Sequence, residues 1–215
     1  MAPDDMGHSV SGNGKRVLIT YENLMAGQAL SPSVFFSHNA SAPKLFELGK
    51  PASFYLMRIA EEGNAGPLLA AVVTHAIGGA YGSAITGVAT QPGKSRAVSL
   101  EVDAQHPMIS GCFMLVMTND GFTGVNGVNG YNLTRPVTMD LYAYDAGTER
   151  NNERAPYLIA MQGTERDPEH GVITRHAGIR GDADAPGIWK FDPRRPVARI
   201  TIAPASQRWE KHHAV

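Results

Sequence analysis

Short stretches of β-branched and aromatic residues alternate with turns along most of this chain. Strands are predicted at residues 16–21, 33–37, 85–89, 96–102, 109–118, 137–144 and 197–203. In the last of these, Ala198, Ile200 and Ile202 share one face, which is the alternation of a half-buried strand. The stretch 109–118 is almost wholly apolar, so it is expected at the centre of a sheet.

Two stretches change to a helical period. Apolar residues recur at helical spacing over 51–63, where Pro51 suits the first turn, and again over 67–75. Seven or so short strands with one helical insertion near residues 51–75 predict an all-β fold, an antiparallel β-sandwich with the helices at one edge. The stretch 163–196 is rich in Gly, Pro, Asp and Arg and is predicted to form long surface loops.

The length of 215 residues fits one domain. We expect a flexible N-terminal segment at 1–15, the sandwich at 16–204 and a C-terminal tail at 205–215. Hydrophobic residues make up 43% and charged residues 18%, so the chain can build a sizeable core.

The charge balance argues against some partners and leaves the location open. With a net charge of -1 and a pI of about 6.7, the chain has no basic excess to attract nucleic acid. No apolar run is long enough to predict a membrane span. Residues 1–16 are polar, which fits either a cytoplasmic chain or a mature secreted chain with an added Met1.

Cysteine and histidine supply little chemistry. The single Cys112 excludes a disulfide within the chain and is expected to be a buried small hydrophobe rather than a nucleophile. The histidines lack the i, i+4 spacing of a helical zinc site, so structural or surface roles are favoured for His38, His75, His106, His170 and His176. No nucleophile elbow and no phosphate-binding loop is found.

The acids in two turns are more informative. Asp120 follows the predicted central strand, and Asp145 follows the next one. Gly147 then turns the chain, so that Thr148 and Glu149 come directly after it. Such loops can direct several oxygens at a hard cation such as calcium. The same residues also fit Asx-turns, in which an acid bonds its own backbone. From the residues alone, the Asx-turn is the favoured interpretation.

Several segments resemble a known family. They are LFELGKPAS at 45–53, AEEGN at 60–64, TNDGFTGV at 118–125 and YDAGTERNNE at 144–153. Over residues 30–203 the chain is similar to the spondin N-terminal domain, which occurs in F-spondin, mindin and many bacterial secreted proteins. The chain resembles a stand-alone bacterial member, because the cysteines of animal members are missing.

The resemblance implies a C2-like sandwich that works outside the cell and holds Ca²⁺. The family's ligand positions fall on Asp120, Asp145 and Glu149, with Thr148, Asn119 and Glu101 as additional candidates. Glu149 stands where animal members have aspartate. Where they have an aromatic residue directly after the first acid, this chain has Gly121 and then Phe122.

The resulting hypothesis is a non-enzymatic, calcium-binding recognition or adhesion module. It would be secreted, periplasmic or on the cell surface, and would bind an extracellular protein, a carbohydrate or another copy of itself. The alternatives are a self-assembling subunit of a surface or matrix assembly, and a calcium-assisted hydrolase using His38 or His106. The integrin-type tripeptide Arg180-Gly181-Asp182 is interpreted as a chance match in a segment rich in these residues.

Overall fold

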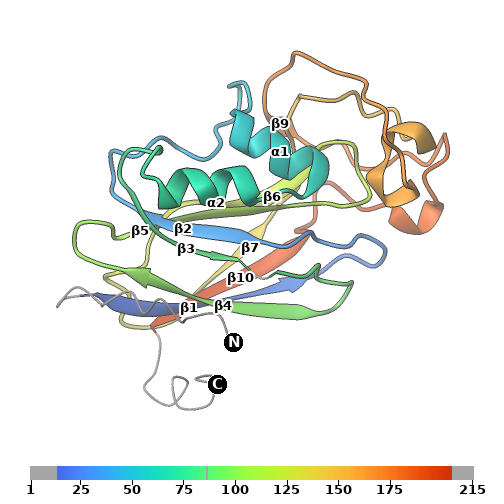
Figure 1. Ribbon diagram of the computed structural model, residues 1–215. Helices are drawn as coiled ribbons and strands as arrows, with labels where there is room; N and C mark the ends of the chain where they lie inside the picture. Colours follow the sequence, from blue (N-terminus) through green and yellow to red (C-terminus); the bar gives the residue numbers. More distant parts are fainter. Residues whose placement is uncertain (1–13, 86, 205–215) are drawn as a thin grey trace, which may run out of the picture.

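Two antiparallel sheets face one another in the part of the chain that the computed structural model describes, residues 14–85 and 87–204 (Figure 1). The four-stranded sheet has the order β4-β1-β10-β7, with β4 at Ser95–Val102, β1 at Lys15–Asn23, β10 at Ala198–Pro204 and β7 at Val137–Leu141. The six-stranded sheet has the order β3-β2-β5-β6-β8-β9, with β3 at Ala80–Ile85, β2 at Val34–His38, β5 at Met108–Met114, β6 at Gly121–Asn129, β8 at Tyr144–Asp145 and β9 at Thr174–Arg175. The predicted all-β sandwich is confirmed.

Alternation sets the register of the four-stranded sheet. Every second residue of β1, from Val17 through Ile19 to Tyr21, is buried against the opposite sheet. Ile19 lies between Ile202 of β10 and Val98 of β4, so apolar residues of three strands share one face. The segment expected to be flexible at 1–15 and the tail at 205–215 lie outside the described residues, except for residues 14 and 15.

Two helices form a third layer. α1 (Phe54–Glu62) and α2 (Gly66–Val73) lie over the outer face of the six-stranded sheet (Figure 1). The prediction that they sit at an edge is wrong, because their apolar residues bury that face rather than flank it. Cys112 of β5 is buried beneath this layer as predicted, and burial raises the pKa of its thiol to about 12.

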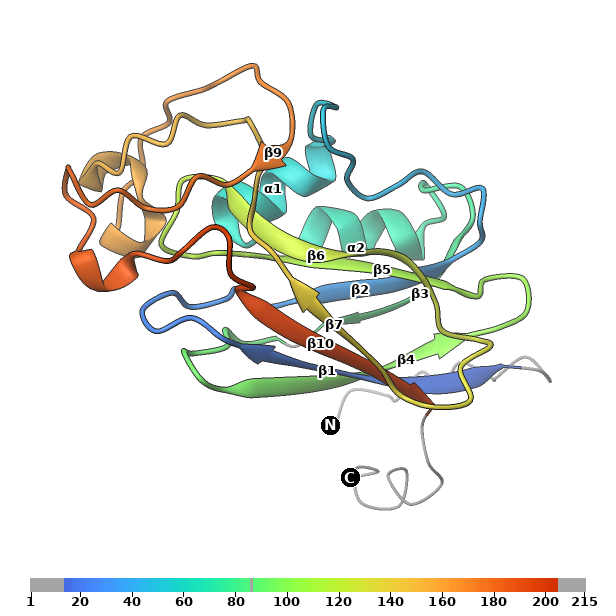
Figure 2. The ribbon, with the colours of Figure 1, turned by 180° about the vertical axis from the view of Figure 1, so that it is seen from behind.

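The strand predictions fail where glycine or a crossover hides the pattern. β6 was not predicted, because its glycines are typical of a loop, yet it lies between β5 and β8. Gly124 is needed there, since a Cβ would lie 2.2 Å from the carbonyl oxygen of Gly111 in β5. The predicted strand at 137–144 is two strands in different sheets: β7 lies beside β10 in the four-stranded sheet (Figure 2), and β8 belongs to the six-stranded sheet. The strand expected at 85–89 lies instead at 80–85, and that expected at 109–118 ends at 114.

Candidate metal site

Two acidic loops lie side by side at one end of the six-stranded sheet. The turn between β5 and β6 is closed by Thr118, whose hydroxyl donates to the carbonyl of Leu115 (2.7 Å) and accepts from the backbone N–H of Gly121 (2.8 Å). Gly121 in turn pairs with Asp145 of β8. This pairing places the loop after Asp145 directly against Asp120.

Asp120 is fully buried and fixes the second loop. Its Oδ2 accepts three hydrogen bonds: from the backbone N–H of Thr148 (2.7 Å), the Thr148 hydroxyl (3.2 Å) and the backbone N–H of Glu149 (3.0 Å). Its Oδ1 is also buried but has no hydrogen-bond partner. One half of this carboxylate therefore holds the loop together, and the other half is left for a donor or a cation.

The carboxylate of Glu149 likewise has one hydrogen-bonded oxygen and one oxygen without a partner. Its side chain is buried, and Oε1 accepts from Nη1 of Arg166 (3.1 Å), while Oε2 is buried without a partner. Arg166 also contacts Glu62 (2.9 Å) and, more loosely, Glu61 (3.9 Å), both in α1. The second loop is thereby linked to the helical layer through one guanidinium group.

The two buried carboxyls are poorly compensated. The pKa of Asp120 is raised from 3.8 to about 7, mainly by burial and also by the charge of Asp145, although the hydrogen bonds from the second loop lower it. The pKa of Glu149 is likewise raised from 4.5 to about 7, mainly by burial; Arg166 acts in the opposite direction, and Glu61 and Asp120 add to the rise. Added positive charge would stabilise both ionised groups.

The other predicted ligands are occupied by local contacts. Asp145 accepts from the backbone N–H of Gly147 (2.7 Å) and from the Asn151 amide, which is the Asx-turn that the residues alone favoured. Asn119 donates through its amide to Asn152 and to the Tyr157 carbonyl (both 3.4 Å).

Glu101 belongs to a different part of the fold. It lies in β4 of the four-stranded sheet and accepts from the Tyr81 hydroxyl (3.3 Å). Among the residues that the structure describes, no three His, Cys, Asp or Glu side chains are grouped to hold a metal ion. A cation here would therefore rely on two carboxylates, together with carbonyl, amide or hydroxyl oxygens, which calcium accepts. The donor types fit calcium and do not fit a zinc site.

His176 is a neighbour that the sequence did not reveal. Its Nδ1 accepts from the backbone N–H of Gly178 (2.9 Å), so the neutral ring carries its proton on Nε2, which is buried without a partner. Burial lowers its pKa, and the charges of Asp145 and Glu153 oppose this. No pattern pointed to it, because it follows the two-residue strand β9 in a long loop.

Thr118 and His176 leave little room for a side chain at Gly121. A Cβ on Gly121 would lie 2.4 Å from the Thr118 hydroxyl oxygen and 3.0 Å from Cδ2 of His176. We expect Gly121→Ala to lower the free energy of unfolding by about 1–3 kcal/mol, measured by urea denaturation. Gly187→Ala is the matched control, because nothing lies within 4 Å of a Cβ there. Equal effects of the two substitutions would contradict this packing.

The tripeptide at 180–182 is held by its backbone. Glu153 is buried and accepts from the N–H groups of Arg180 and Gly181, both at 2.6 Å. The Arg180 side chain pairs with Asp182 (3.0 Å). These contacts account for the segment as an anchored loop.

The histidines of the hydrolase hypothesis have their own partners. Nε2 of His38 lies 2.8 Å from the Ser110 hydroxyl, and Nδ1 lies 2.8 Å from the carbonyl of Asn39. His106 contacts the carboxylate of Asp103 (3.0 Å). Neither set of contacts includes Asp120 or Glu149.

These observations define a β-sandwich domain with two buried carboxylates on adjacent loops at one end of a sheet, each with one oxygen that has no partner. The Spondin_N family model matches residues 25–161, and the chain belongs to this family. The family is one of extracellular-type, non-enzymatic recognition and adhesion modules. No curated protein matches the chain. None of the described helices has the length and apolar character needed to cross a membrane.

The matched range separates two groups of residues. It contains Asp120, Asp145 and Glu149, the three predicted ligands. Arg166 and His176 lie beyond it. The acids therefore belong to the family segment, and their cationic and imidazole neighbours come from the loops that follow.

Proposed function

We propose that this protein is an extracellular, calcium-dependent recognition module. Asp120 and Glu149 would hold Ca²⁺ through their side chains, and Asp145 through its side chain or backbone. The observation that supports this most directly is the pair of unpartnered buried oxygens, Asp120 Oδ1 and Glu149 Oε2. Buried polar atoms normally have hydrogen-bond partners, so two such carboxylate oxygens on adjacent loops call for a donor or a cation.

Calcium would act structurally in this proposal. It would supply the positive charge that Asp120 and Glu149 lack, and would hold the loop after β5 against the loop after β8. Binding of an extracellular protein or carbohydrate would then use the surface of these ordered loops. No proton or group transfer is assigned to them.

Calcium is expected to raise the melting temperature. At a calcium concentration of about 100 Kd, binding to the folded state alone adds about 2.7 kcal/mol of stability. For a domain of this size, that is a shift of roughly 5–10 °C. Differential scanning calorimetry in calcium-free buffer, with calcium and with magnesium measures it, and magnesium should give the smaller shift.

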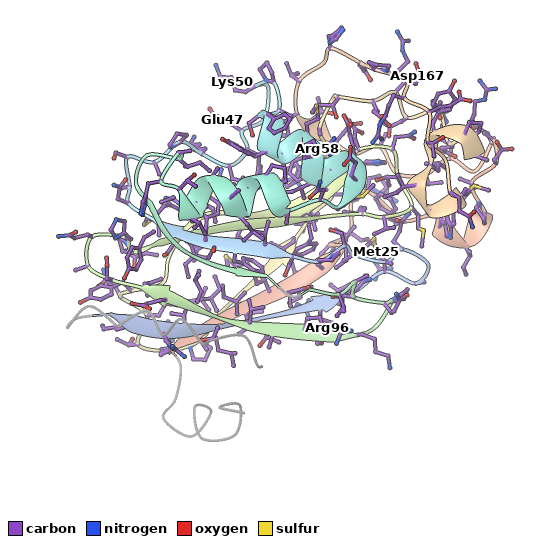
Figure 3. All side chains as sticks on the ribbon, in the orientation of Figure 1. Met25, Glu47, Lys50, Arg58, Arg96 and Asp167 are labelled. Carbon is purple, nitrogen blue, oxygen red and sulfur yellow. The ribbon has the colours of Figure 1, made fainter. Side chains whose placement is uncertain are left out.

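Two variants connect the shift to the site. Glu149→Gln keeps an oxygen for Arg166 but removes the charge, and should lose most of the calcium-induced shift. Glu47→Gln is the control, because Glu47 (labelled in Figure 3) is exposed and forms a surface ion pair with Lys44 (3.4 Å). Identical melting curves of the native chain with and without calcium would refute the metal site.

A further inference from the structure

A cavity of about 390 Å³ lies at the end of the four-stranded sheet where β1 ends and β10 begins. Residues 24–26, directly after β1, form one wall, and residues 190–192 and 195–197, before β10, form the other. The backbone N–H of Leu24 donates to the carbonyl of Val197 (3.0 Å), whose own N–H donates to Leu141 (2.8 Å). Both walls are therefore fixed to strands, and the volume suits a small organic molecule.

The cavity carries uncompensated positive charge. Lys190 and Arg195 are among the residues that line it, and no side-chain ion pair or hydrogen bond of either is seen among the described residues. The end of the Lys190 side chain lies beside Gly181, where a Cβ would be 2.5 Å from its Cε, and the charge of Arg195 acts on Asp192. The one acid in the lining, Asp192, is bound through both carboxylate oxygens by Arg194, at 3.0 Å each. The hydrogen bonds from Arg194 lower the pKa of Asp192 to about 2, so it remains ionised but paired. Two cations are left for a ligand.

The rest of the lining is largely apolar. Met25 is buried, and Leu24, Phe191 and Pro196 complete an apolar surface beside the two cations. Phe191 also packs against His176, with ring centroids 5.3 Å apart, which fixes its position. A ligand that uses the whole cavity must therefore combine an anionic group with an apolar body.

We propose that this cavity binds a small organic anion with a phosphate or carboxylate head group. The Arg195 guanidinium can donate two parallel hydrogen bonds to such a head group, and Lys190 supplies a second positive charge. The apolar body lies against Met25 and Phe191. The cations lie outside the range matched by the family, and the proposal is independent of calcium.

Isothermal titration calorimetry of the full chain tests this, in calcium-free buffer without chelator, because chelators are themselves polyanions. Phenyl phosphate and benzoate are the probes, and they distinguish the two head groups. Inorganic phosphate supplies the head alone, and benzyl alcohol the body alone. We expect saturable binding of one or both probes, at least 10-fold tighter than that of inorganic phosphate or benzyl alcohol, and weaker at higher salt.

Variants locate the site. Lys190→Ala/Arg195→Ala should weaken probe binding at least 10-fold, and Arg194→Ala should also weaken it, by releasing Asp192 to pair with Arg195. Lys50→Ala is the control and should leave binding unchanged, because Lys50 lies in the loop before α1, away from Met25 (Figure 3).

Three results would overturn the proposal. They are no saturable binding of either probe, full binding by the double variant, and equal affinity for inorganic phosphate, which would indicate an adventitious ion only. A calcium-independent melting temperature would refute the metal site and leave this cavity untouched, so the two proposals fail separately.

Discussion

Asp120→Ala is expected to lower the free energy of unfolding by about 3–5 kcal/mol, measured by urea denaturation in calcium-free buffer. The substitution removes the Oδ2 acceptor and leaves the N–H groups of Thr148 and Glu149 and the Thr148 hydroxyl without their partner. Each unsatisfied buried donor costs about 1–3 kcal/mol. The same variant should show no calcium-induced rise in melting temperature.

Asp120→Asn separates the two functions of this carboxylate. The amide oxygen can still accept the three hydrogen bonds, but the charge is gone. In calcium-free buffer at pH 8 we expect this variant to lie within about 1 kcal/mol of the native chain, because the lost charge was itself buried. It should nevertheless lose the calcium response. If asparagine were as destabilising as alanine, the hydrogen bonds would not be the main contribution.

The pKa of Asp120 fixes how the stability difference between the native chain and Asp120→Asn depends on pH. The pKa of Asp120 is about 7 in the folded protein and near 3.8 in the unfolded chain, so between these values the folded state binds more protons. Its contribution to stability is therefore complete below about pH 4 and is lost as the pH rises towards 7. The native-minus-asparagine difference in unfolding free energy should decline over this window without calcium, and calcium should flatten the decline.

The sequence correctly indicated that the acids of the two loops lie close together. It did not indicate which hydrogen-bond partners surround them. Asp120 lies in the turn between β5 and β6, and Asp145 is the last residue of β8. Because β6 pairs antiparallel with both β5 and β8, these two strands run in the same direction and the loops that follow them meet. Alternation and loop position are visible in the chain. The sequence does not show which carboxylate oxygens lack a partner, because this depends on the donors of Thr148 to Asp120 and of Arg166 to Glu149.

The missed features have physical causes as well. β6 escapes a search for apolar alternation because close strand packing requires Gly124, and glycine is also the residue of turns. Arg166 and His176 come from loops without any period, and their positions are determined by the tertiary contacts they make. Glu149 was expected only as a metal ligand. In the folded chain it binds Arg166, which the tertiary structure brings next to it.

Arg166→Ala is the other substitution with a large expected effect. Arg166 is shared by Glu149 and Glu62 and, more loosely, by Glu61, and its loss removes the guanidinium that pairs with the buried Glu149. Because Arg166 is itself 37% exposed, we expect a loss of about 1–3 kcal/mol rather than the full effect of breaking a buried pair. Arg150→Ala is the control and should cost under about 0.5 kcal/mol, since its pair with Asp167 (3.6 Å) is more exposed.

Calcium should reverse much of this loss, because Arg166 and the metal ion act on the same carboxylate. Removing the guanidinium removes the repulsion of an incoming cation, so the calcium-induced rise in melting temperature should be larger in Arg166→Ala than in the native chain. Arg166→Lys keeps the charge but cannot span Glu149 and Glu62 in the same way. Its calcium-induced rise in melting temperature should therefore lie between that of the native chain and that of Arg166→Ala. A calcium shift equal in all three would mean that Arg166 only links the loop to α1, and that the cation binds elsewhere.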